Sequence, residues 1–126
     1  MTPRLKPDTP TGLDYYPLST IGERFPINDP ELKPKLEPRP EDDVLFLQGM
    51  LEGIARIEER GYRLLEKLGA PYPVSVRTTG GGAQNPAWTQ IRQHYLKTVM
   101  KEPRHSEAAY GSALLAQRVA KQSINL

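Results

Sequence analysis

The stretch TTGGGAQNPAW (residues 78–88) has the composition best suited to bind a ligand. Its three consecutive glycines carry no side chains, so a flat ring or a ribose can approach the backbone closely. Amide groups at the start of a following helix can meet negative or electron-rich groups. The sequence therefore predicts a binding turn within this stretch.

A simpler interpretation stays open, because a tight turn from a strand to a helix needs only one glycine, and Asn85 could serve only as a helix cap. The known phosphate-binding motifs do not fit. A P-loop requires a lysine and a serine or threonine after its last glycine, and a Rossmann turn spaces its glycines as G-x-G-x-x-G. Ala83, Gln84 and Asn85 supply neither pattern, so a ligand here is not held by its phosphates alone.

Other candidate sites are weaker. His94 and His105 are remote in sequence and have no evident carboxylate partner, which argues against a metal site. The acidic clusters fall on predicted helix ends and faces, where capping or solvation explains them. No serine lies in a nucleophile elbow. We therefore expect no catalytic residue and no metal ligand in this chain.

The strongest predicted element is a long amphipathic helix in residues 40–68. Pro40 is placed at its start with acidic residues in the first turn, and Gly69 ends it. Gly49 and Gly53 lie four residues apart, which predicts close packing against a neighbouring segment. Apolar residues recur at helical spacing: Leu47, Met50, Leu51, Ile54, Ile57, Leu64, Leu65 and Leu68.

Strands and helices alternate after this helix. Residues 73–79 are predicted to be a strand, a helix follows with Asn85 as its cap and Pro86 at its first position, and residues 97–101 form a weak strand. An alanine-rich helix capped by Ser106 closes the chain. This alternation predicts an α/β fold with parallel pairing.

The first 40 residues have a different composition, with nine of the 13 prolines. We expect a flexible leader in residues 1–11, a proline-rich ordered arm in residues 12–40, and the α/β part in residues 41–126. A short strand is expected within residues 12–18, and a disordered arm is the alternative. The arm should be held by isolated apolar residues: Ile21, Phe25, Ile27, Leu32 and Leu36.

Composition narrows the partners and the compartment. The formal charge of +2 is too small and too evenly spread to predict a nucleic-acid or anionic-membrane surface. The chain has no cysteine, which excludes disulfides and thiolate metal sites and fits a reducing compartment. No secretion signal or membrane span is recognisable, so we expect a cytoplasmic protein.

Four motifs resemble the C-terminal part of the FGGY family of carbohydrate kinases, and they occur in the family's order. They are GERFPINDP (residues 22–30), FLQGMLEGIARIE (residues 46–58), TTGGGAQNPAWTQIR (residues 78–92) and EAAYGSALLA (residues 107–116). The resemblance covers residues 12–120 and is nearest to the branch that acts on ketopentoses. It implies an actin-like, ribonuclease-H-like ATPase fold, of which this chain would be a part.

The resemblance also implies roles for individual residues. It places Gly80, Gly81 and Gly82 along an adenosine pocket, Asn85 against the adenine or the ribose, and Gln84 and Trp88 nearby. Glu52 and Glu107, typical of the family, are more consistent with structural roles. The cofactor would be ATP, with magnesium in the complete kinase.

The family's phosphate loops, its sugar-binding residues and its catalytic aspartate are not among the motifs present. We therefore expect an adenosine-binding fragment of a ketopentose kinase that does not phosphorylate sugar alone. The alternative is a free-standing, non-catalytic nucleotide-binding or oligomerisation module, which a natural start at Met1 would favour. ATP or ADP is the expected ligand, and the uncovered apolar stripe predicts self-association or association with the missing part of the kinase.

Overall fold

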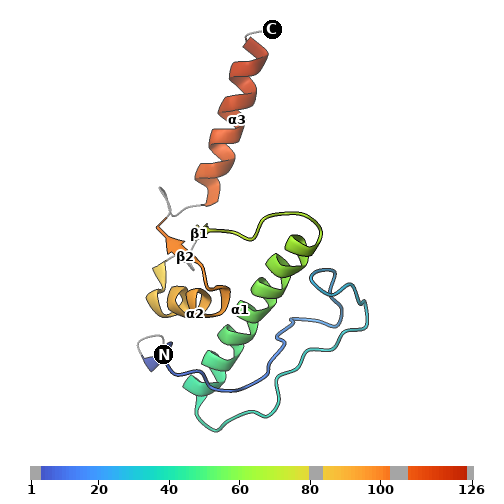
Figure 1. Cartoon of the computed structure of the whole chain (residues 1–126), viewed down its shortest axis with the longest axis vertical. Helices are drawn as coiled ribbons and strands as arrows, with labels where there is room; N and C mark the ends of the chain where they lie inside the picture. The colour runs from blue at the N-terminus through green and yellow to red at the C-terminus, as the bar shows by residue number, and fades with distance from the viewer. Residues whose placement is uncertain (1–3, 80–83, 103–107, 125–126) are drawn as a thin grey trace.

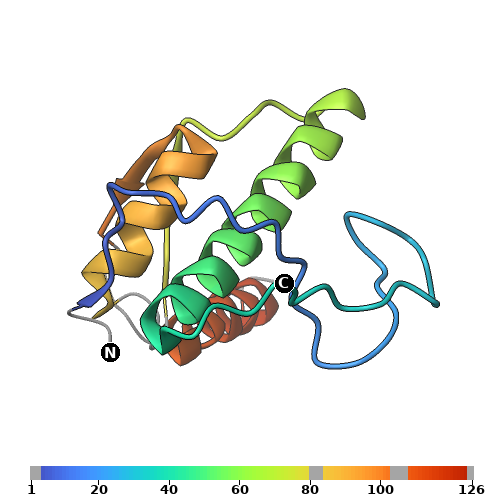
Figure 2. The ribbon, with the colours of Figure 1, turned by 90° about the horizontal axis from the view of Figure 1, so that it is seen from below.

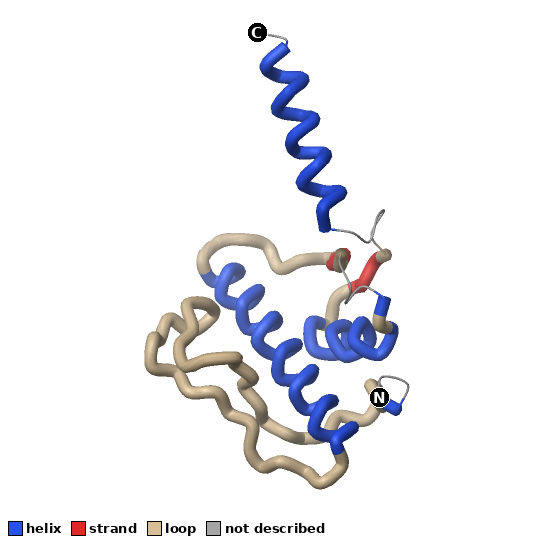
Figure 3. The backbone as a smooth tube through the Cα atoms, turned by 180° about the vertical axis from the view of Figure 1, so that it is seen from behind, coloured by secondary structure: helices blue, strands red, loops and turns tan. Residues whose placement is uncertain are grey.

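The structure is a computed structural model that describes residues 4–79, 84–102 and 108–124. In chain order the elements are α1 (Asp43–Lys67), β1 (Ser75–Arg77), α2 (Pro86–Leu96), β2 (Val99–Lys101) and α3 (Ala108–Ile124). Helix α1 lies between the proline-rich arm on one side and α2 on the other, and α3 projects away from this body (Figures 1 and 3). The described elements form an α/β structure, as the sequence predicts.

Helix α1 begins at Asp43, one turn later than the start predicted at Pro40. The reason is the Asp42 side chain, which accepts a hydrogen bond from the backbone N–H of Val44 at 2.9 Å and so caps the helix. The other end agrees with the prediction, because Gly69 follows the helix with a positive φ of 108° that favours glycine.

The arm packs directly on the glycines of α1. A Cβ atom added to Gly49 would lie 2.8 Å from Cδ1 of Leu13, and one added to Gly53 would lie 2.7 Å from the carbonyl oxygen of Tyr15. Any larger side chain would push the arm away, which confirms the close packing predicted for this pair. In Figure 2 the two limbs of the arm cross α1, and the loop between them extends on the side away from α2.

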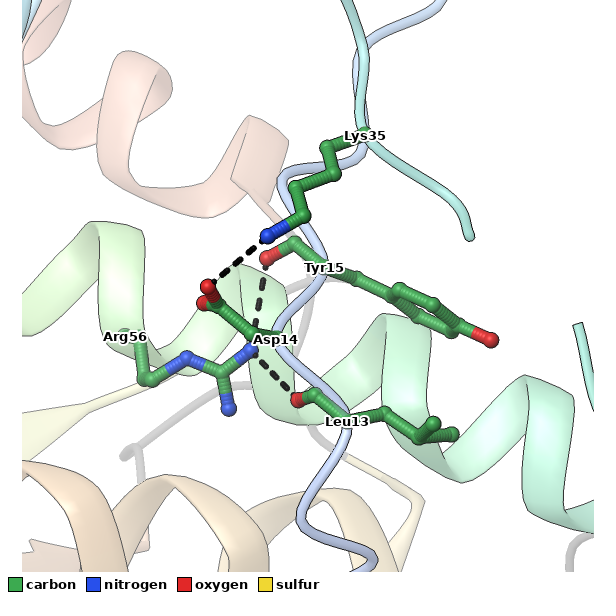
Figure 4. Close-up of polar contacts among 5 residues, drawn as sticks. All are labelled: Leu13, Asp14, Tyr15, Lys35 and Arg56. Carbon is green, nitrogen blue, oxygen red and sulfur yellow. Dashed lines mark hydrogen bonds and ion pairs between the residues drawn. The ribbon is translucent and has the colours of Figure 1, made fainter. Parts of the chain in front are cut away.

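Arg56 holds the arm in place from the middle of α1. Its Nη2 atom donates to the carbonyl oxygens of Leu13 at 3.0 Å and Tyr15 at 3.3 Å (Figure 4). Beside it, Lys35 forms an exposed ion pair with Asp14 at 3.0 Å that connects the two limbs of the arm, and this lysine lowers the pKa of Asp14. Hydrogen bonds to the arm's backbone thus replace the pairing that a sheet would provide.

The expected anchors of the arm are buried only in part, since Ile27, Leu32 and Leu36 are half-buried. Ile21 and Phe25 are exposed, although the Phe25 ring still meets α1 at Gly61. The buried residue is Tyr15, 2% exposed, whose ring packs edge-on against Phe46 and whose hydroxyl donates to the carbonyl oxygen of Pro38. Within residues 12–18, Tyr16 forms only an isolated bridge with Lys35, so the strand expected there is wrong.

Residues 4–11, expected to be part of a flexible leader, have specific contacts with α1. Leu5 is buried, and the Gln48 side chain accepts from the N–H of Lys6 and donates to its carbonyl oxygen, both at 2.9 Å. The Thr11 hydroxyl donates to Glu52 at 2.6 Å. A frayed end would lack such contacts.

The buried face of α1 differs from the predicted apolar stripe. None of the stripe's eight residues is buried, whereas Gln48 is 2% exposed and Glu52 only 1%. The arm and α2 cover small and polar positions, where glycines allow close approach and the two polar side chains bond the N-terminal segment. The partial exposure of the apolar stripe agrees with the uncovered surface that the sequence predicts.

The second half of the body is a β-α-β unit. Strands β1 and β2 pair in parallel, with Val76 opposite Met100, which confirms the predicted pairing. Helix α2 joins them, and its Ile91 and Leu96 are almost fully buried against the body. Both strands are three residues long, shorter than the stretches predicted.

Helix α3 shows no such burial. All side chains described in residues 111–121 are exposed, with Leu115 at 64%. Its predicted cap, Ser106, lies outside the described residues. No helix within the described ranges combines the length and the apolar character that crossing a membrane requires.

Candidate functional site

A pocket of about 420 Å³ lies where the carboxyl ends of β1 and β2 meet the first turn of α2. Ligands of open α/β sheets bind at this edge, and small-molecule pockets span roughly 300 to 1,000 Å³. Larger hollows exist, such as one of about 700 Å³ beside Leu5 and Gln48, but they lie away from the carboxyl ends of the strands. The pocket is lined by Thr78, Gln84, Pro86, Thr89, Gln90, Met100, Lys101 and Glu102.

Of the six predicted site residues, Gln84 lines this pocket. Asn85 is the cap of α2, and its side-chain oxygen accepts from the N–H of Trp88 at 3.1 Å. That bond fits the capping role that the sequence left open. Trp88 is half-buried, with the Arg92 guanidinium 5.6 Å from its ring centre. Gly80, Gly81 and Gly82 lie outside the described residues.

Arg92 connects the pocket to the helices behind it. Its guanidinium donates to both carboxylate oxygens of Glu58 on α1, at 2.6 and 2.9 Å, and to the hydroxyl of Thr78 just after β1. The Arg92 side chain is 8% exposed. One side chain thus joins α1, α2 and the strand end that leads to the glycines.

The lining suits a nucleoside better than a bare phosphate. The amides of Gln84 and Gln90 and the hydroxyls of Thr78 and Thr89 can donate to and accept from a base or a ribose. Met100 adds a polarizable surface for a ring. The two charged residues of the lining, Lys101 and Glu102, have opposite signs, so the lining has no strong excess of positive charge.

Within the described residues, no group of three or more His, Cys, Asp or Glu side chains could hold a metal ion. Whatever charge the site presents comes from the lysine and glutamate at the end of β2 and from the amides that begin α2.

Several lining residues were missed by sequence reasoning. Thr89 and Gln90 lie one turn into α2, and Met100, Lys101 and Glu102 lie at the end of β2. The sequence did contain a signal for the residues at the end of β2, because a second parallel strand must end at the same edge of the sheet as the first. Residues 97–101 carry only a weak strand pattern, so the sequence does not single out the residues at their end.

The parallel strands, the joining helix and the pocket define an α/β domain with a pocket beyond the carboxyl ends of its strands, the edge at which ligands of such sheets bind. The sequence model of the C-terminal domain of the FGGY family of carbohydrate kinases matches residues 4–120. The chain therefore belongs to the FGGY family and contains its C-terminal domain, which has a ribonuclease-H-like, actin-like fold. Kinases of this family use ATP and a divalent metal.

Proposed function

We propose that this chain is the adenosine-binding part of an ATP-dependent ketopentose kinase and does not phosphorylate a sugar alone. The pocket at the carboxyl ends of β1 and β2 is the observation that carries the proposal, because Thr78 and Gln84, which flank the glycines in the sequence, both line it. The family match supports a carbohydrate kinase, and the resemblance of the four motifs is nearest to the ketopentose branch. ATP supplies the phosphoryl group, and magnesium is held by the complete kinase.

The adenosine is bound by backbone and by neutral side chains. Gly80, Gly81 and Gly82 give the ring access to the peptide backbone, and Gln84 bonds the base or ribose from the pocket wall. The cap uses only the side-chain oxygen of Asn85, and its amide nitrogen carries two donors that we assign to the adenosine. Trp88 supports this wall from behind through its contact with Arg92.

Calorimetric titration of ADP and ATP into the purified chain tests the proposal. Asn85→Ser keeps a capping oxygen but removes the amide, so it separates ligand binding from capping. We expect Asn85→Ser, Asn85→Ala and Gly81→Val each to weaken ADP binding about tenfold, the equivalent of about 1.4 kcal/mol. Gly111→Val, in the exposed α3, is the control and should leave the affinity unchanged.

Two results would contradict the proposal. Absence of nucleotide binding, or tight binding unchanged by all three site variants, would move the site elsewhere. Sugar phosphorylation by this chain alone would show that it is more than the adenosine-binding part.

A non-catalytic oligomerisation module is the second candidate, and the exposure of α3 favours it. Three apolar side chains of α3 are about half exposed or more: Leu114, Leu115 and Val119. Exposed apolar surface of this kind is typical of a site that binds another protein surface. We propose that a second copy or the remainder of a kinase covers it. Sedimentation velocity over a range of concentrations tests self-association, which Leu115→Glu should abolish. A monomer at every concentration would leave only the kinase remainder as the cover.

A further inference from the structure

Each of the three nitrogens of the Arg92 guanidinium donates a hydrogen bond, and the bonds go to two partners in different parts of the chain. Nε and Nη2 bond the two carboxylate oxygens of Glu58 on α1, and Nη1 bonds the hydroxyl of Thr78. Because the planar fork fits a carboxylate with two parallel bonds, Glu58 fixes the orientation of the whole group. The direction of Nη1, and with it the position of the Thr78 hydroxyl, follows from that pairing.

Stability alone does not account for this arrangement. Taking an ion pair out of water is unfavourable, and buried pairs often contribute little net stability compared with apolar residues of similar size. Glu58 is also well covered, with 22% of its side chain exposed. A bidentate pair in this setting instead holds the guanidinium in a single orientation.

The residue that the Arg92–Glu58 pair positions lies next to the proposed adenosine site. Thr78 is the first residue after β1, lies two residues before Gly80 and lines the pocket, whereas Arg92 and Glu58 do not line it. We propose that Arg92 is a positioning residue for nucleotide binding, which sets the strand end before the glycine turn through Thr78. This inference rests on the proposed function and assigns that site its supporting residues.

The test is a double-mutant cycle of ADP affinity, measured by calorimetry on the 126-residue chain. Thr78→Val removes the hydroxyl at nearly constant shape, and Thr78→Ser retains it. Arg92→Lys removes the bidentate pair but keeps the charge. Because Thr78 could also touch the nucleotide itself, the cycle compares Thr78→Val in the wild-type and Arg92→Lys backgrounds.

We expect Thr78→Val and Arg92→Lys each to weaken ADP binding about tenfold, and the double variant by about tenfold as well rather than a hundredfold. Thr78→Ser should remain within about twofold of wild type. Arg56→Lys is the matched control, because it disturbs the arginine that holds the arm. It should lower the urea midpoint of unfolding without changing the affinity.

Additive losses would show that Thr78 acts directly on the nucleotide and would overturn the positioning role. An Arg92→Lys variant with unchanged affinity would overturn it too, while ADP binding by the wild-type chain would leave the proposed function standing. If the wild-type chain binds no nucleotide, both proposals fail. Should Arg92→Lys not fold, Glu58→Gln takes its place in the cycle.

Discussion

Helices α1 and α3 differ in how they are covered. Helix α1 is enclosed by the arm and α2, yet the positions it buries include glycines and the polar Gln48 and Glu52. Helix α3 exposes every side chain described in residues 111–121, and these include Leu114, Leu115 and Val119. Burial in this chain therefore follows close backbone approach and specific hydrogen bonds rather than the apolar pattern alone.

Helices α1 and α3 also differ in what stabilises them. The central part of α1 is stabilised by tertiary contacts, such as the bonds from Arg56 to the arm and from Glu58 to Arg92. Helix α3 depends on its own alanine-rich sequence, unless another surface covers it. Substitutions with the same chemistry should therefore give different results in the two regions.

The largest difference is expected at Tyr15, which joins the arm to α1. Tyr15→Ala removes a buried ring and its contact with Phe46, and losses of large aromatic side chains typically destabilise by about 3 to 5 kcal/mol. Urea unfolding monitored by circular dichroism measures the change. Leu115→Ala in α3 should change the free energy of unfolding by less than about 0.5 kcal/mol in the monomer. Equal effects at the two positions would contradict the comparison.

Gly53→Ala should destabilise the chain, although alanine is the better helix former. The new methyl group would lie 2.7 Å from the backbone carbonyl oxygen of Tyr15 and 3.0 Å from Cδ of Pro17. Overpacking of this kind costs about 1 to 3 kcal/mol, more than the roughly 1 kcal/mol gained in helix propensity. The free energy of unfolding in urea provides the measurement. A stabilised variant would mean that the arm does not press on α1 in solution.

Much of the fold was predictable because several signals are local. The end of α1 at Gly69, the cap and first residue of α2 at Asn85 and Pro86, and the parallel strands follow from capping and alternation rules. The coverage of α1 was not predictable, because glutamine and glutamate are normally counted as surface residues. Only the hydrogen bonds of Gln48 and Glu52 to residues 4–11 explain their burial.

The site was predicted in part, for a similar reason. The three glycines lie outside the described residues, and Gln84, which follows them in the sequence, lines the pocket. The contribution of β2 and the Arg92 contact depend on which residues meet across the fold. Nothing in the spacing of Glu58 and Arg92, 34 residues apart, indicates that they pair.

A smaller effect on stability, which depends on pH, is expected at Tyr72. Its hydroxyl donates to the carbonyl oxygen of Leu96 at 2.6 Å, and burial, the largest cause, raises the pKa of Tyr72 above its usual 10. A raised folded-state pKa means that this contribution is complete below about pH 10 and is lost as the pH rises through the folded-state value. Tyr72→Phe should therefore cost about 1 kcal/mol at pH 8.

The difference between Tyr72→Phe and wild type should shrink above pH 10, as the wild-type phenol ionises and loses its donor. Urea unfolding at pH 8 to 11 measures it, with the tyrosinate absorbance followed in parallel. Burial also raises the pKa of Tyr16, Tyr62 and Tyr95, so the variant itself will still lose stability at alkaline pH. A difference between the two proteins that stays constant across this range would show that the Tyr72 hydroxyl does not titrate with the fold.

A small effect of the opposite sign is expected at Gly111 in α3. A methyl group added there meets nothing within 4 Å, so Gly111→Ala should stabilise the helix by up to about 1 kcal/mol. Circular dichroism at 222 nm should show higher helicity and a later loss of signal on heating. The same change in α1, Gly53→Ala, is predicted to destabilise. The two alanine variants together therefore test whether contact with a neighbouring segment, rather than helix propensity, decides the change in stability. A destabilised Gly111→Ala would reveal a surface packed against α3 in solution, close enough to exclude a single methyl group.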